Sequence, residues 1–324
     1  MLILSEADLR RLLPPAECIP VMREALAALA RGDVEQPVRR PVLVPPGAAG
    51  LLAAMPAYTA APTPAFGLKA VCVFPGNPAA GLDAHQGAVL LFSGTTGEPL
   101  ALLNASTVTE LRTPAVTAVA TDLLARPDAT ELVIAGAGVQ GVSHARALAR
   151  VRPFRRIRLA ARDAERARAA CARLSAELDL PVEPADSLAD AVATADVVVT
   201  ATTSPTPILD RSWLRPGTHV NAIGSSVPST REIDTATMAS ATVFADSAAS
   251  VAVDTGDYLF AAAETAVSIS ASIGEVLIGT APGRTSPDEI TLFKSVGLPV
   301  EDLFAARHAV AQARSHGLGQ HVEI

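Results

Sequence analysis

The sequence predicts an α/β fold in two domains, and three observations support this prediction. Residues 131–151 run from an apolar segment through a glycine-rich turn into a helical pattern. Strand and helix patterns then alternate to about residue 245, which is typical of a parallel sheet. In residues 1–104, by contrast, two helical patterns come first and a series of strand patterns follows. A chain of 324 residues has room for two such domains.

The glycine-rich turn predicts a dinucleotide site. Gly136, Gly138 and Gly141 have GxGxxG spacing between an apolar strand and a helix. Such glycines allow a tight turn, close approach of the backbone to a pyrophosphate and close packing of helix on strand. The helix also directs free N–H groups at the phosphates. A merely tight turn is the alternative, but the βα units that follow favour a dinucleotide. We therefore expect the three glycines, Val139 and Gln140 to bind the cofactor.

The later βα units predict a doubly wound, Rossmann-type parallel sheet. Strands are expected at 156–161, 196–202, 219–223 and 242–245. Ligands of such sheets bind beyond the carboxyl ends of the strands. Further residues at or near such ends are therefore expected to bind the cofactor: Thr200, Thr202, Ser225 and Ser295.

The first part of the chain predicts a separate α+β unit. A helix from about Ala16 to Ala30 is closed by Gly32. Strands are then expected, separated by turns rich in proline and glycine: 38–44, 51–55, 66–74, 88–92 and 100–104. A helix over 107–124 leads to the dinucleotide strand, and the last helix is expected at 301–316.

Three cations stand out in this unit: Arg39, Lys69 and Arg112. Lys69 lies in the otherwise apolar segment FGLKAVCVF. A lysine in such a strand points to solvent, pairs with a carboxylate or holds a ligand. From the pattern alone, we expect an outward-facing lysine.

The second strand of the dinucleotide domain indicates which nicotinamide cofactor binds. An acid about twenty residues past the glycines would hold the ribose hydroxyls of NAD. Position 161 is an alanine, and Arg162 follows, whose guanidinium suits a 2′-phosphate. Asp163 keeps NAD open, because a shift of two residues in the turn would restore an acid. We expect NADPH or NADH, with NADP favoured.

Composition excludes several other classes. The net charge of −7 argues against nucleic-acid or anionic-membrane partners. The three cysteines are widely spaced, without CxxC or a zinc-like Cys/His cluster, so we expect reduced thiols and no metal. Neither a signal peptide nor a membrane-spanning apolar run is present, which predicts a cytoplasmic protein.

Six segments together resemble the ornithine cyclodeaminase/μ-crystallin family: FGLKAVCVFPGNP, TVTELRTPAVTAVAT, GAGVQG, ADVVVTATTS, GTHVNAIGSSVPSTREID and GRTSPDEITLFKSVGLPVEDL. The resemblance covers nearly the whole chain in order. It implies a homodimer of subunits with two domains. Residues 1–115 with 300–324 would bind substrate and build the dimer interface, and residues 116–299 would bind the dinucleotide.

The resemblance also implies roles for single residues. Arg39, Lys69 and Arg112 would bind the carboxylate of an α-amino or α-imino acid, although Arg40 leaves the first position open by one residue. Ser226 stands where cyclodeaminases and archaeal alanine dehydrogenases of the family have an aspartate. A serine is neither an anionic partner for an ammonium group nor a ready base. Ketimine reductases similar to μ-crystallin share this serine.

The predicted function is an NAD(P)H-dependent imine (ketimine) reductase that transfers hydride to a carboxylate-bearing C=N and forms an α-amino acid. The candidate catalytic residues are Lys69, Arg112, Ser226 and His85. His85 titrates in a range that suits proton transfer, although a solvated turn histidine is the alternative. The rival enzymes are an ornithine or lysine cyclodeaminase, with Glu232 as a displaced acid, and an alanine-type amino-acid dehydrogenase. An NADP-dependent binding protein of crystallin type is the rival without turnover.

Overall fold

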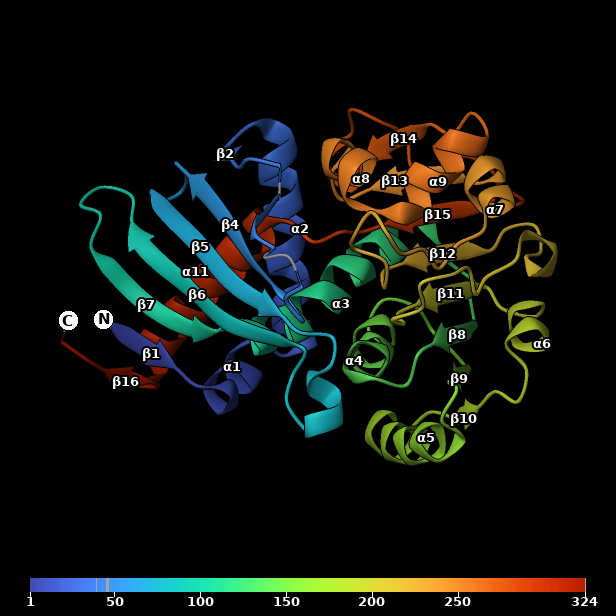
Figure 1. The fold of residues 1–324 in the computed structure, drawn as a ribbon, viewed down its shortest axis with the longest axis horizontal. Helices are drawn as coiled ribbons and strands as arrows, with labels where there is room; N and C mark the ends of the chain where they lie inside the picture. Colours follow the sequence, from blue (N-terminus) through green and yellow to red (C-terminus); the bar gives the residue numbers. More distant parts are fainter. Residues whose placement is uncertain (39, 45–46, 324) are drawn as a thin grey trace. The chain divides into compact units, whose positions relative to one another are not determined.

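The computed structural model describes residues 1–38, 40–44 and 47–323, except for the side chains of 40–43 and 78 (Figure 1). The chain forms two compact units. One unit is Met1–Thr113 with Leu298–Ile324, and the other is Pro114–Gly297. Helices and strands mix in both units, and the second has a parallel sheet, so the predicted α/β class is confirmed.

The first unit is built on a mostly antiparallel sheet in the order β16-β1-β7-β6-β5-β4-β2, with β3 paired to β4. Its strands are β1 (Leu2–Leu4), β2 (Val34–Glu35), β3 (Arg40–Leu43), β4 (Leu51–Thr59), β5 (Ala65–Val73), β6 (His85–Ser93), β7 (Pro99–Asn104) and β16 (Gln320–His321). Sequence patterns located the five longer strands. They missed β1 and β16, because segments of two or three residues show no periodicity.

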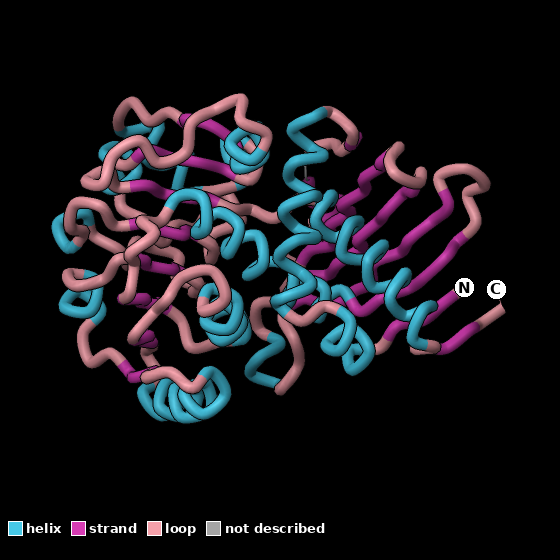
Figure 2. Tube along the Cα trace, turned by 180° about the vertical axis from the view of Figure 1, so that it is seen from behind, coloured by secondary structure: helices cyan, strands magenta, loops and turns pink. Residues whose placement is uncertain are grey.

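Helices cover one face of this sheet (Figure 2). They are α1 (Glu6–Leu12), α2 (Pro15–Arg31) and α11 (Pro299–His316), and a short 3₁₀ turn, η1 (Asn77–Ala80), precedes β6. A left-handed glycine ends each long helix, with φ of 79° at Gly32 and 62° at Gly317. Helix α11 packs on β4, β5 and β6 and against α2. The inner face of β5 therefore faces α11.

The second unit contains a sheet in the order β10-β9-β8-β11-β12-β15-β13-β14, with every neighbouring pair parallel (Figure 1). Its strands are β8 (Glu131–Ala135), β9 (Arg156–Ala160), β10 (Val182–Pro184), β11 (Val197–Thr200), β12 (His219–Ala222), β13 (Thr242–Ala245), β14 (Ile269–Ser272) and β15 (Thr291–Lys294). The strand order reverses between β8 and β11. Such a switch point is where doubly wound sheets bind their ligands.

Helical segments connect these strands: α4 (Val139–Leu148), α5 (Ala164–Leu178), α6 (Leu188–Val192), η2 (Arg211–Trp213), α7 (Thr235–Ser240), α8 (Ala248–Asp254), α9 (Gly256–Glu264) and α10 (Ile273–Leu277). Helix α3 (Ala105–Leu124) belongs to both units, because the boundary falls at Thr113. Strands β8, β11 and β12 are buried throughout apart from Glu131, so β8 and β11 have nearly continuous apolar runs, whereas β12 carries the buried polar residues His219 and Asn221. Among the described residues, no helix is both long and apolar enough to cross a membrane.

Candidate active site

Two of the three glycines after β8 are required by the fold itself. Gly136 has φ of 121°, and a Cβ there would meet the carbonyl oxygen of Ala201 at 2.5 Å. A Cβ at Gly141 would lie 1.8 Å from the carbonyl oxygen of Gly136. Any side chain at either position would therefore force the turn apart.

Gly138 differs from its neighbours. Its φ of −81° suits any residue, and a Cβ there would meet no atom closer than Nη2 of Arg166 at 3.8 Å. Gly138 is also the N-cap of α4, where no side chain satisfies the first N–H groups. The fold has no need of a glycine at this position, whereas a pyrophosphate approaching the backbone does. The turn therefore fits a dinucleotide.

Glu232 joins the loops that follow β11 and β12. Its Oε1 accepts the backbone N–H of Thr202 at 2.7 Å and the Thr202 hydroxyl at 2.6 Å, and its Oε2 accepts the N–H of Gly224 at 2.7 Å. Glu232 is fully buried, which raises the pKa of its carboxyl. Both carboxylate oxygens are engaged with these two loops, which speaks against Glu232 as the displaced acid of a cyclodeaminase.

A buried ion pair, Lys294 with Asp257, holds the backbone next to Glu232 in place. Nζ of Lys294 donates to Oδ2 of Asp257 at 2.8 Å, and both side chains are fully buried. Oδ1 of Asp257 accepts the backbone N–H groups of Glu232 and Ile233 at 2.7 and 3.0 Å. Asp257 thus fixes the backbone at Glu232 through charge-assisted hydrogen bonds.

Ser225 and Ser295, which the sequence predicts to bind the cofactor, lie at strand ends, but their hydroxyls form hydrogen bonds within the protein. The Ser295 hydroxyl donates to Oδ2 of Asp246 at 2.9 Å, and Ser225 is buried with its hydroxyl donating to the carbonyl oxygen of Thr230. Thr200, which ends β11, is fully buried. Ser226 is half-buried in the loop after β12.

The end of β9 carries the residues predicted to select the cofactor. The strand ends at Ala160, and Arg162 is exposed two residues later. Asp163 is the N-cap of α5, and its Oδ1 accepts the N–H of Arg166 at 3.0 Å. The nearest acid is therefore engaged in capping a helix.

In the first unit, Lys69 and Arg112 lie in one buried ionic cluster with two acids. Nζ of Lys69 is 3.3 Å from both carboxylate oxygens of Asp302. Nε of Arg112 donates to Oδ1 of Asp302 at 3.2 Å, and its Nη1 lies 2.7 Å from Oε2 of Glu301. All four side chains are at most 5% exposed. The predicted outward-facing lysine is wrong: Lys69 is on the inner face of β5, where α11 supplies the partner carboxylate.

The acids occupy the first turn of α11, where the helix dipole favours negative charge. The side chain of Gln36 caps the same turn, since its Oε1 accepts the N–H of Val300 at 2.9 Å. Sequence reasoning missed Glu301 and Asp302 as site residues. Adjacent acids at a helix start also occur as ordinary dipole partners, so their pattern carried no specific signal.

Of the two other predicted site residues of this unit, the structure describes His85. Arg39 lies outside the described residues. His85 begins β6, is exposed, and pairs in register with Val73. Its backbone oxygen accepts the hydroxyl of Ser106.

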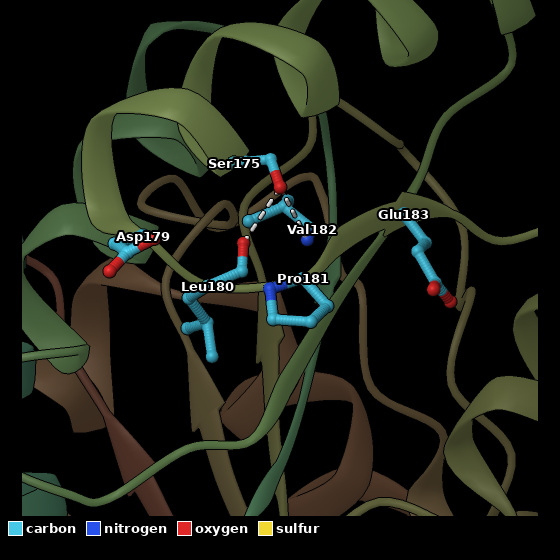
Figure 3. Close-up of a pocket in the computed structure, with 6 residues that line it drawn as sticks. All are labelled: Ser175, Asp179, Leu180, Pro181, Val182 and Glu183. Carbon is cyan, nitrogen blue, oxygen red and sulfur yellow. Dashed lines mark hydrogen bonds between the residues drawn. The ribbon is translucent and has the colours of Figure 1, made fainter.

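A pocket in the second unit is lined by none of the predicted site residues (Figure 3). Its lining residues belong to the end of α5 and the start of β10: Ser175, Asp179, Leu180, Pro181, Val182 and Glu183. The hydroxyl of Ser175 closes this turn by donating to the carbonyl oxygen of Leu180 at 2.8 Å. The pocket is at the amino end of the sheet, opposite the ligand edge. Within the described part of the chain, no group of three or more His, Cys, Asp or Glu side chains could hold a metal ion.

Comparison with known proteins shows which family this chain belongs to. The chain is 37% identical to mouse ketimine reductase mu-crystallin over 292 residues, which cover 89% of this chain and 90% of that protein. The structure of Thermococcus litoralis Delta(1)-pyrroline-2-carboxylate reductase, in complex with NADH and L-proline, matches with a TM-score of 0.95 and 33% identity over 99% of this chain and 100% of that one. An archaeal alanine dehydrogenase dimer with bound NAD matches with a TM-score of 0.93 and 29% identity over 100% and 99% of the two chains. The model of the ornithine cyclodeaminase/mu-crystallin family matches residues 1–317, so the chain belongs to that family.

Proposed function

We propose that this protein is an NAD(P)H-dependent imine reductase that converts an α-imino acid, cyclic or open-chain, into an α-amino acid. The C=N carbon gains a hydride and the nitrogen gains a proton, while the reduced nicotinamide is oxidised to NAD(P)⁺. Relatives support this reaction, since one is a ketimine reductase and another, a pyrroline-2-carboxylate reductase, is solved with NADH and L-proline. Five-membered and six-membered cyclic ketimines with a 2-carboxylate are the leading substrates.

The buried pair of Lys69 and Arg112 is the observation that carries this proposal. Two cations in a protein interior are costly unless they are paired, and Asp302 contacts both. Their fixed donors suit a planar carboxylate, which would be held with its neighbouring carbon in a defined place. Arg39 is proposed as the third cation, on the segment that Gln36 ties to α11.

The charge of the proposed site favours a substrate with a carboxylate. Among the described residues, Lys69 and Arg112 supply two positive charges, and the two acids of α11 supply two negative charges. The proposed third cation, Arg39, would leave one positive charge for the substrate carboxylate. An amino acid with an extra ammonium group, such as ornithine, would add a further positive charge to this buried site.

The glycine turn, Thr202 and the neighbouring strand ends would hold the cofactor. Bound there, the reduced nicotinamide supplies the hydride. Glu232 keeps two of the loops in place through Thr202 and Gly224. Arg162 favours NADPH over NADH, because no acid follows β9 before the helix cap at Asp163. Ser226 and His85 are the proposed candidates for the donor of the proton that the nitrogen gains.

One assay separates this function from its rivals. NADPH and NADH oxidation is followed by absorbance with pyrroline-2-carboxylate, piperideine-2-carboxylate and iminosuccinate, while ornithine is tested for release of ammonia and proline. Cofactor oxidation with an imine supports the reductase. Proline from ornithine without imine reduction would instead support a cyclodeaminase, and nucleotide binding without any turnover would support a binding protein.

A variant assay tests whether Arg112 binds the substrate carboxylate. Arg112→Ala should raise KM for the imine about tenfold or more, while the cofactor affinity of the folded variant stays near wild type. The variant also loses the ion pairs with Glu301 and Asp302, so its thermal midpoint is measured alongside KM. Arg31→Ala, an exposed arginine of the same unit paired with Glu24 and Asp33, is the control. An unchanged KM in Arg112→Ala would remove Arg112 from the site.

A homodimer is proposed from the uncovered face of the first unit's sheet (Figure 1). Phe66 is 47% exposed on this face, with Tyr58 against its ring at 4.7 Å between centroids. Phe92 and Leu90 lie opposite Phe66 and Leu68 in the register of β5 and β6. An extended apolar face of this kind commonly marks an interface. The archaeal alanine dehydrogenase is solved as a dimer, which makes a second copy of this chain the natural partner.

The cytoplasm is the proposed location. Cys18, Cys72 and Cys171 are all free thiols. Burial raises the pKa of Cys18 to about 12, so its thiol stays protonated and unreactive. Free thiols in a chain of this size fit a reducing compartment.

A further inference from the structure

The side chain of Arg166 folds back from α5 toward the glycine turn. Its backbone N–H donates to the N-cap Asp163, which places Arg166 in the first turn of that helix. Its Nη2 is the nearest atom to the position that a Cβ of Gly138 would take, at 3.8 Å. The guanidinium thus lies beside the residue whose open backbone accommodates the cofactor.

The structure of the protein alone does not account for this arginine. Two arginines of the same region have acidic partners: Arg168 pairs with Glu165, and Arg146 pairs with Glu177 at 2.8 Å. Among the described residues, the exposed guanidinium of Arg166 has no hydrogen bond or ion pair. A cation in the first turn of a helix is also opposed by the helix dipole. The position therefore weakens α5 slightly, and no contact within the described part of the chain compensates for this.

Arg162, which precedes Arg166 by four residues, is a second exposed arginine of this kind. It is exposed just past β9 and also has no polar side-chain partner among the described residues. The end of this second strand is where doubly wound folds hold the adenosine ribose, and the glycine turn holds the pyrophosphate. Arg162 lies just past this strand end, and Arg166 lies at the start of the helix that follows it.

We propose that Arg166 is a specificity-determining residue that binds the ribose 2′-phosphate of NADP together with Arg162. A phosphate dianion accepts bidentate hydrogen bonds from two guanidinium forks, and it also compensates the cation at the helix start. This inference rests on the proposed cofactor site and adds a residue to it. NAD, which has a hydroxyl in place of the phosphate, would gain little from either arginine.

The test is isothermal titration of the whole protein with 2′,5′-ADP and with 5′-AMP, two probes that differ only by the 2′-phosphate. Arg166→Ala should weaken 2′,5′-ADP binding about tenfold and change 5′-AMP binding by less than about twofold. Arg168→Ala is the matched control on the same helix turn, and it should leave both affinities within about twofold of wild type. Circular dichroism and the thermal midpoint confirm that each variant is folded.

Two results would overturn the inference. An unchanged 2′,5′-ADP affinity in Arg166→Ala would mean that the arginine is only a surface residue. Equal weakening of both probes would place Arg166 on the 5′-phosphate instead of the 2′-phosphate. Wild-type protein that binds neither probe would refute the cofactor site of the proposed function, whereas probe binding without imine reduction would refute only the proposed reaction.

Discussion

Nζ of Lys69 lies 3.3 Å from both carboxylate oxygens of Asp302, a residue 233 positions later in the chain. This contact joins the centre of β5 to the first turn of α11. Asp302 also accepts from Arg112, so one carboxylate orients both described cations of the proposed substrate site. Asp302 is therefore a positioning residue.

Asp302→Asn should destabilise the protein by about 3 kcal/mol, because it leaves a buried ammonium without its anionic partner. Urea denaturation measures this loss. Adding Lys69→Met should recover part of it, since the uncompensated charge is then removed. Asp128→Asn, at an exposed carboxylate 3.8 Å from Arg126, is the control and should cost less than about 0.5 kcal/mol. Equal stability of Asp302→Asn and wild type would contradict the role given to this contact.

Gly138→Ala and Gly141→Ala should separate cofactor binding from folding. A methyl group at Gly138 has free space, so the thermal midpoint should stay at the wild-type value while NADPH affinity falls about tenfold. A methyl group at Gly141 would lie 1.8 Å from a backbone oxygen, so that variant should lose stability first. Scanning calorimetry and fluorescence titration measure the two effects. A Gly138→Ala protein that binds NADPH normally would show that no phosphate approaches this residue.

Two buried histidines should make the second unit sensitive to acid. Burial lowers the pKa of His144 from 6.5 to about 4 and that of His219 to about 3. Below pH 6.5 the unfolded chain binds protons at these rings while the folded chain does not. Stability should therefore fall as pH drops from 6.5 toward 4, by about 1.4 kcal/mol per pH unit for each ring.

Urea denaturation at pH 7, 6 and 5 measures this slope. His144→Gln removes one titrating ring and should reduce the slope by one histidine's share. A variant whose stability varies with pH as steeply as wild type would show that His144 does not stay neutral in the folded protein.

Phe66→Glu should convert the proposed dimer into a monomer, because a carboxylate would then be buried in the apolar contact. Size-exclusion chromatography with light scattering measures the mass. Phe260→Glu, at a ring 42% exposed on α9, is the matched control and should leave the mass unchanged. A Phe66→Glu protein with the mass of two chains would place the interface elsewhere.

Much of the second unit could be predicted from local patterns. A buried strand, glycines at fixed spacing and a following helix are consecutive in the chain, so Gly136 to Gly141 were identified without any long-range information. Local patterns could not show whether the hydroxyls of Ser225 and Ser295 bind a cofactor or other groups of the protein. Both are at strand ends, yet their hydroxyls bond to Thr230 and Asp246, contacts that the sequence does not reveal.

In the first unit, the sequence did not reveal the contacts of the charged residues. The apolar segment of β5 could be recognised as a strand, but the face on which Lys69 lies could not, because the sequence of a strand leaves open which face is covered and by what. The partner acids were also hidden, since Glu301 and Asp302 are far from both cations in sequence.

By itself, the sequence determined the α/β class, the dinucleotide turn and the identity of the cations, all of which follow from residue type and short-range spacing. Only the tertiary structure decided that Lys69 and Arg112 share one carboxylate at Asp302, that Glu232 clamps two loops, and that Gly138 is open to a ligand. The physical reason is that hydrogen bonds and ion pairs act between groups in space. Chain neighbours alone do not specify which distant groups the packed helices and strands bring into contact.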